Sequence, residues 1–398
     1  MGAAAREHGR RRRAGGRRGM TPRGMPRVTP EIPGGVRLTA LSGIGVKGPA
    51  CFLLETETGR VLLDLGKGPD GEALPDVAGV GAVDAVIFSH GHVDHTGGVG
   101  LLPQLGAPTL YATAPTRALA REPSVAVAEE IPSRIAGLDV ETGPSGHAPG
   151  AVWQRFGGRS GLVYTGDMSE ESLLFAFTLP PPAEVLLFDA SYGAAAEPLA
   201  DQCRELLAMA EAGPLLLPAP AGGRGLEMAL AFLEAGHPVA ICPAHREVAE
   251  RLLHQPESWL TPGGQARLRH LLREAHLLTP DSPARGVMIG AGPNAERGVT
   301  EQLAPRFLAE NRARVIYTGH LAEGAPAARQ VAEGQALFRR WNVHPTLTGL
   351  RALMEAVRPR IAMPAFCTSD RAEALAAALG RPMFTGRQVE WALGQVGA

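Results

Sequence analysis

Apolar and polar positions follow different patterns in the two parts of the chain. In the first part, short apolar runs bounded by turn residues are typical of β-strands. They predict strands over residues 36–41, 51–55, 60–64, 84–89, 151–156, 161–165 and 184–189. Helices are expected there over residues 114–121 and 125–130.

After Tyr192, apolar runs alternate with segments of helical period, which indicates a mostly parallel α/β unit. The expected helices cover residues 198–212, 224–235, 245–254, 264–275 and 347–357. The expected strands cover residues 214–218, 237–242, 286–290, 314–318 and 360–364. We therefore predict a first domain that carries an inserted α/β domain. The expected parts of the chain are a basic tail (1–35), the first part of the first domain (36–190), the insertion (191–330) and the return to the first domain (331–398).

Charge is distributed unevenly along the chain. Residues 1–27 hold nine of the 39 basic residues and one of the 40 acidic residues, so the remainder has a net charge of −9. This composition predicts a disordered tail or a start site placed too early, with Met20 or Met25 as the true start. The alternative is an arm that binds nucleic acid. Because the rest of the chain is acidic, a nucleic-acid substrate would need a local basic groove.

Two further features bear on the compartment. No apolar run approaches the roughly 18–20 residues of a membrane helix, so no membrane partner is expected. The four cysteines lie far apart and form no CxxC motif. A disulfide framework is therefore not expected, and a reducing cytoplasm fits the chain.

A group of possible metal ligands follows the apolar run 84–89. Residues 89–95 read SHGHVDH, which brings together His90, His92, Asp94 and His95. Neutral imidazoles suit zinc and other late first-row metals, and a carboxylate adds negative charge. The alternative is a histidine-rich surface loop. The HxHxDH spacing directly after a predicted buried strand favours a metal site.

This motif resembles that of the metallo-β-lactamase superfamily. The other positions of that family occur in order, as Asp64 in VLLDLG, His147 in SGHAPG and Asp167 in VYTGD. The resemblance implies an αββα sandwich that binds zinc, with manganese as an alternative. It implies these metal ligands: His90, His92 and His147 for the first ion, Asp94 and His95 for the second, and Asp167 between them. Asp64 would orient a ligand, and Asp94 would orient the metal-activated hydroxide.

A second set of motifs resembles the β-CASP proteins, which are largely nucleases such as ribonuclease J. Residues 188–193 (FDASYG) resemble the motif that opens the β-CASP insertion, and His344 matches the second motif of that family. The resemblance covers residues 36–390. It implies that Asp189 orients His344 and that His344 protonates the leaving oxygen of a phosphodiester. The alternatives are a strand-end cap for Asp189 and a buried structural role for His344.

One position departs from the β-CASP pattern. Phe366 stands 22 residues after His344, where the family has a histidine that binds the second metal. A phenyl ring cannot bind a metal, and Cys367 would point to the other face of a strand. We therefore expect one tightly bound metal and a second that is weak or absent. The alternative is that Cys367 or His320 supplies the missing ligand.

The resemblance favours a metal-dependent nuclease that cleaves phosphodiester bonds, with RNA as substrate and partner. Two other functions stay open at this stage. One is a hydrolase of the same fold that acts on a substrate other than nucleic acid. The other is a non-catalytic scaffold in an RNA-processing assembly.

Overall fold

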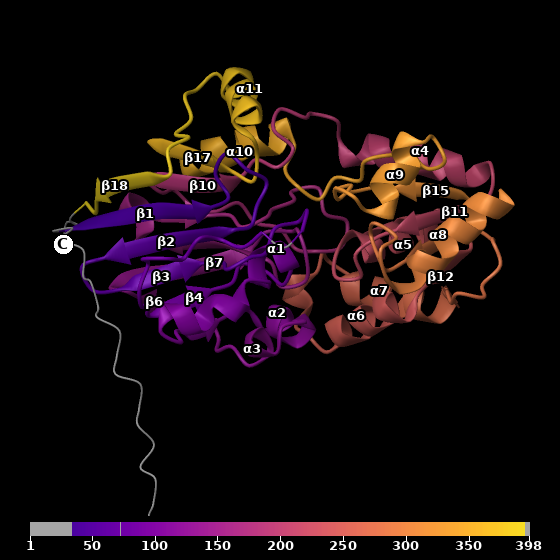
Figure 1. Ribbon diagram of the computed structural model, residues 1–398, viewed down its shortest axis with the longest axis horizontal. Coiled ribbons are helices and arrows are strands. Elements are labelled where there is room, and N and C mark those ends of the chain that lie inside the picture. The colour runs from indigo at the N-terminus through magenta and orange to yellow at the C-terminus, as the bar shows by residue number, and fades with distance from the viewer. Residues whose placement is uncertain (1–33, 72, 395–398) are drawn as a thin grey trace, which may run out of the picture.

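The computed structural model describes residues 34–71 and 73–394. Nearly all of the basic tail expected over residues 1–35 lies outside these ranges. Within them, the strands form three six-stranded sheets, and Figure 1 shows two of these sheets beside a third that has its own helices. None of the described helices is long and apolar enough to cross a membrane.

The first sheet has the order β18-β1-β2-β3-β4-β5. Its strands are β1 (Gly35–Ser42), β2 (Cys51–Thr56), β3 (Arg60–Leu63), β4 (Ala85–Ile87), β5 (Thr109–Tyr111) and β18 (Gln388–Ala392). β1, β2 and β3 form the predicted antiparallel meander, and β4 pairs in parallel with both β3 and β5. The carboxyl ends of β3 and β4 therefore lie next to each other.

The second sheet has the order β17-β10-β9-β8-β7-β6. Its strands are β6 (Arg134–Ile135), β7 (Leu138–Pro144), β8 (Val152–Phe156), β9 (Leu162–Tyr164), β10 (Val185–Asp189) and β17 (Ile361–Ala365). β9, β10 and β17 are parallel to one another. The residues before and after the third sheet thus meet in one sheet, because β17 pairs with β10.

Buried apolar side chains join the first two sheets face to face. One cluster contains Phe52 and Leu54 of the first sheet with Leu187 and Met363 of the second. Helices α10 (Leu347–Val357) and α11 (Ser369–Leu379) cover the outer face of the second sheet. On the outer face of the first sheet lie η1 (Val99–Leu105), α2 (Ala114–Leu119) and α3 (Pro123–Ala126). These layers form the expected αββα sandwich.

The third sheet is wholly parallel, with the order β13-β12-β14-β11-β15-β16. Its strands are β11 (Leu215–Pro218), β12 (Val239–Ile241), β13 (His276–Leu277), β14 (Val287–Gly290), β15 (Arg314–Tyr317) and β16 (Leu337–Phe338). Leu215 and Leu217 pack on one face of this sheet and Leu216 on the other. The first face is covered by α4 (Leu199–Glu211), α5 (Arg224–Glu234), α6 (Pro243–Leu253) and α7 (Gly264–Glu274), and the second by α8 (Gly298–Glu310) and α9 (Pro326–Ala332). This is the predicted α/β unit.

Two local differences from the sequence predictions have clear causes. The helix expected over residues 125–130 is wrong, because α3 ends at Ala126 and Glu129 pairs with the edge of β5 through Ala112 N and Leu110 O. The third sheet also extends to β16, past the boundary expected at residue 330, through a strand too short to recognise from its pattern. The division into domains at residues 190 and 330 stays a prediction.

Candidate metal centre

Several candidate residues lie where strands of the sandwich end. Asp64 follows β3, the loop with His90 follows β4, Asp167 follows β9, and Asp189 is the last residue of β10. Because β3 pairs with β4 and β9 with β10, the side chains gather at one end of the two sheets. In Figure 1 this end, marked by helix α1 (Val93–Thr96), faces the unit built on the third sheet.

Close backbone contacts fix the histidine loop after β4. The Asp94 carbonyl accepts a hydrogen bond from Ala50 N at 2.9 Å, and the His95 carbonyl accepts one from Leu65 N at 2.9 Å. A Cβ atom at Gly66 would lie 1.7 Å from the Asp94 carbonyl oxygen, so only glycine permits this approach. The loop is therefore held against the segment that follows β3.

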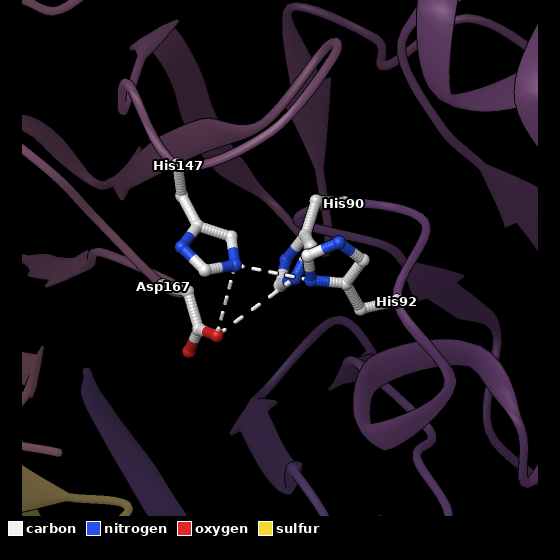
Figure 2. A group of neighbouring side chains, drawn as sticks. All are labelled: His90, His92, His147 and Asp167. Carbon is white, nitrogen blue, oxygen red and sulfur yellow. Dashed lines mark hydrogen bonds and ion pairs between the residues drawn. The ribbon is translucent and has the colours of Figure 1, made fainter. Parts of the chain in front are cut away.

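His90, His92, His147 and Asp167 form a first group whose ligand atoms all lie within 4.8 Å of one another (Figure 2). His147 Nε2 is 3.0 Å from His92 Nδ1 and 3.4 Å from Asp167 Oδ2. His90 Nε2 is 3.9 Å from the same carboxylate oxygen. Ligands about 2.0–2.1 Å from a tetrahedral zinc ion are separated by roughly 3.3 Å, so the spacing fits such an ion.

The opposite ring nitrogen of each of these histidines has a hydrogen-bond partner. The partners are Ser89 Oγ for His90 Nδ1 (3.1 Å), the Gly222 carbonyl for His92 Nε2 (2.9 Å) and the Val343 carbonyl for His147 Nδ1 (2.6 Å). Such contacts orient the rings of metal-binding histidines. His90 Nε2 is buried and has no hydrogen-bond partner in the described chain, an arrangement that a metal ion would satisfy.

The pKa values of the buried histidines also suit metal binding. Burial and the neighbouring histidines hold the pKa of His90 and of His147 well below the ordinary value. These rings are therefore neutral at pH 7, which is the form that binds a metal. The donor set fits a transition metal such as zinc, because it consists of imidazole nitrogens and one carboxylate.

Asp94, His95 and Asp167 form a second group. His95 Nε2 lies 3.2 Å from Asp167 Oδ1, and His95 Nδ1 donates to Asp64 Oδ2 at 2.7 Å. Burial alone would lower the pKa of His95, but the carboxylates of Asp167 and Asp64 raise it well above the ordinary value. Burial alone would raise the pKa of Asp94, yet the neighbouring histidines lower it. Asp167 thus contributes one carboxylate to both groups.

Asp64 is fully buried and organises the base of the site. Its carboxylate accepts hydrogen bonds from Ser89 N and Ser89 Oγ, both at 2.7 Å, and from the Tyr164 hydroxyl at 2.5 Å. Together with His95 Nδ1, these donors satisfy both carboxylate oxygens. Asp64 therefore holds His95 in place without facing the metal groups itself.

Asp189 and His344 lie beside Asp167 and form a third group with it. His344 Nδ1 is 2.7 Å from Asp189 Oδ2 and 3.8 Å from Asp167 Oδ2. Burial alone would lower the pKa of His344, but the two carboxylates raise it. The Tyr192 ring packs edge-on against His344, with 4.9 Å between the ring centroids. The pair expected from the sequence is therefore in contact at the edge of the metal groups.

Phe366 follows β17 and adopts a left-handed backbone conformation with φ 61°. Its ring packs against His95 and belongs to none of the candidate metal groups in the described chain. Neither alternative ligand joins them: His320 bonds to Asp70, and Cys367 packs in the apolar core beneath α10 and α11.

Sequence reasoning missed several contributors to the site: Tyr164, Tyr192 and the carbonyl groups of Gly222 and Val343. Tyr164 carried a weak signal, because a tyrosine ending an otherwise apolar strand needs a partner for its hydroxyl. The two carbonyl groups carried none, since every residue has one and only the tertiary fold selects which is used.

Comparisons with known proteins show what this chain is similar to. The family model of the metallo-β-lactamase superfamily matches residues 44–209. The transcription termination factor FttA of Methanosarcina mazei is 30% identical over 251 residues, which are 50% of this chain and 39% of that protein. FttA of Cenarchaeum symbiosum is 29% identical over 245 residues, 48% of this chain and 38% of that protein. The matched part of the chain thus spans about two-fifths of the length of these relatives.

Longer alignments extend the likeness. Ribonuclease TTHA0252 of Thermus thermophilus is 26% identical over 340 residues, which are 70% of this chain and 78% of the ribonuclease. A crystal structure of a protein of unknown function from Enterococcus faecalis V583 shares the fold, with a TM-score of 0.53 and 15% identity. It covers 90% of this chain and 100% of its own. Residues 44–209 therefore match the metallo-β-lactamase superfamily, and the chain is similar to transcription termination factors and to a ribonuclease.

Proposed function

We propose that this protein is a metal-dependent nuclease that cleaves phosphodiester bonds in RNA. The observation that carries the proposal is the Asp189–His344 pair, in which 2.7 Å separates Nδ1 from Oδ2, at the edge of two candidate metal groups. A phosphodiester needs both a nucleophile and a proton for its leaving oxygen, and the site offers groups for each. The 26% identity to a ribonuclease over 70% of the chain supports RNA as the substrate.

In this proposal two groups of residues hold metal. His90, His92, His147 and Asp167 hold one ion tightly, and Asp94, His95 and Asp167 hold a second ion weakly. Zinc suits the nitrogen and oxygen donors, and manganese is the alternative. A bound divalent metal supplies a coordinated water of lowered pKa and positive charge against phosphate oxygens.

The protein side chains have separate tasks in the reaction. Asp94, a half-buried member of the second group, also orients the attacking water. Asp189 holds His344 through Nδ1, and within the described chain His344 Nε2 has no hydrogen-bond partner. From that nitrogen His344 protonates the leaving oxygen. Asp64 keeps His95 oriented through Nδ1.

The domain division belongs to the same proposal. Residues 36–190 and the return from residue 331 to 398 would form the metal-binding domain, and residues 191–330 a β-CASP-type insertion that covers it, whose sheet also takes in β16 of the return. The hydrogen bond from His92 Nε2 to the Gly222 carbonyl supports this division, because it joins a metal ligand to the insertion. All four cysteines are free, which supports a reducing cytoplasm as the location.

Replacing the proposed general acid tests this assignment. His344→Ala should lower the rate of RNA cleavage by about 10²–10⁴ while the metal content stays unchanged. The loss should be smaller on bis(p-nitrophenyl) phosphate, whose leaving group needs no proton. The matched control is His270→Ala, because His270 is exposed on α7; this variant should cleave like the wild type. Equal losses on both substrates would mean that His344 is structural.

A further inference from the structure

We propose that Lys47 and Arg371 form a phosphate-binding subsite beside the metal centre, which the substrate strand occupies through its anionic phosphate oxygens. The inference rests on the proposed nuclease function and names residues that contact the substrate. The net negative charge of the chain opposes the binding of a polyanion. The chain outside residues 1–27 has a net charge of −9, so a polyanion needs local cations to approach the site.

Lys47 lies on a loop that is held against the metal centre. The loop joins β1 to β2, and at its end Ala50 N donates to the Asp94 carbonyl at 2.9 Å. At its start, the Gly43 carbonyl accepts a hydrogen bond from Phe366 N at 2.8 Å. Both anchors belong to residues around the second metal group. The loop therefore has a fixed position beside that group.

The side chain of Lys47 is half-buried and borders a hollow. It lines a cavity of about 260 Å³ together with Gly68, Pro69 and Asp70. The carboxylate of Asp70 in this wall is already engaged by His320 and by Glu323 N. No carboxylate of the described residues lies within ion-pair distance of Lys47. The ammonium group is thus partly withdrawn from water without a direct counter-ion, and such a group favours an anion.

The charged groups that influence Lys47 include residues of the candidate metal centre. Burial lowers its pKa, the carboxylates of Asp70, Asp94 and Asp167 oppose that shift, and Arg371 adds to it. Asp94 and Asp167 are proposed metal ligands, so a bound metal would neutralise their negative charge. The positive charge of Lys47 also reaches His344, the proposed general acid. The charge of Lys47 therefore acts on the residues of the proposed site, and the anchored loop keeps it beside them.

Arg371 supplies the second cation, from the helix α11 that covers the second sheet. It lies in the first turn of α11, and its Nη1 donates to the Ser191 carbonyl at 3.1 Å. That contact holds the exposed guanidinium next to the segment that follows Asp189. Arg371 forms no ion pair with a carboxylate within the described part of the chain. The loop of Lys47 reaches the start of α11, because Gly45 pairs with Thr368 in a parallel bridge. Two cations on these adjacent segments repel each other, and a phosphate would relieve that repulsion.

RNA binding tests the subsite directly. Metal-loaded His344→Ala protein, which turns over slowly, is titrated with a single-stranded ten-nucleotide RNA at several salt concentrations. Adding Lys47→Met should raise the Kd for this RNA on the order of tenfold, because one charge-assisted hydrogen bond to a phosphate is lost. It should also reduce the salt slope by about 0.7, the value for one phosphate contact on a single strand. Lys47→Arg should keep both the Kd and the salt slope close to those of the parent protein. Arg371→Leu should raise Kd and reduce the salt slope, as Lys47→Met does.

The controls separate this proposal from the proposed function. Arg312→Ala, an exposed arginine after α8, should leave Kd and the salt slope unchanged. Inorganic phosphate titrated into the metal-loaded protein by calorimetry is a second probe, and Lys47→Met should weaken its binding. If phosphate binding weakens but no variant binds RNA, the anion site stands and the nuclease function is wrong. If Lys47→Met binds both ligands like the wild type, or loses its metal, the phosphate subsite is wrong.

Discussion

The ring of Phe366 lies edge-on against the ring of His95, with 5.3 Å between the ring centroids. His95 is one of three residues in the second candidate metal group, whereas the first group has four. The phenyl ring supplies no ligand and presents an apolar wall, which disfavours a hydrated ion. The two metal groups of this protein are therefore unequal in their ligands and in their surroundings.

This inequality predicts unequal metal binding. The wild type should retain about one metal ion per chain after mild chelation and lose the second. Phe366→His should raise the occupancy of the second group, because histidine is tolerated at a positive φ and restores a nitrogen ligand. Metal titration followed by elemental analysis measures both quantities, with Phe338→His on β16 as a control outside the site. Two equally tight sites in the wild type, unaffected by Phe366→His, would show that Phe366 has no part in metal binding.

Asp64 should be more important for stability than any single donor that it binds. Asp64→Asn keeps the size of the side chain but places an amide donor among four donors in a buried site. We expect a loss of about 3–5 kcal/mol in the free energy of unfolding, as for a broken buried ion pair. Tyr164→Phe removes only one hydroxyl donor and should cost about 1.5–3 kcal/mol, the range for a hydrogen bond to a charged group. Urea unfolding of both variants measures the difference, and similar losses would mean that Asp64 is not the organising group.

Metal removal should lower the thermal stability of the protein. A ligand that binds only the folded state stabilises it by about 2.7 kcal/mol at a concentration one hundred times its Kd. Chelation should therefore lower Tm by several degrees, and zinc should restore it. His147→Ala, which removes a ligand of the first group, should unfold at a Tm that chelation barely changes. A wild-type Tm that is the same with and without chelator would argue against a tightly bound metal.

The local part of the site was predictable, because four possible ligands occur within six residues after one apolar strand. The pairing of Asp189 with His344 spans 155 residues and was expected only from the resemblance to β-CASP proteins. Local pattern could not reveal the Gly222 and Val343 carbonyls, since the fold alone selects them. The wrong prediction of a helix over residues 125–130 has a related cause. Glu129 forms backbone hydrogen bonds with Leu110 and Ala112 at the edge strand β5, and a local pattern does not show such distant partners.

Cleavage of labelled single-stranded RNA by the metal-loaded protein tests the central claim most directly. The wild type should cleave the RNA, the chelated protein should not, and His92→Ala and Asp94→Ala should abolish cleavage because each removes a ligand of one metal group. His270→Ala should retain the wild-type rate. The contradicting result is a wild type as inert on RNA as these two variants, together with hydrolysis of a small ester or thioester that the variants lose.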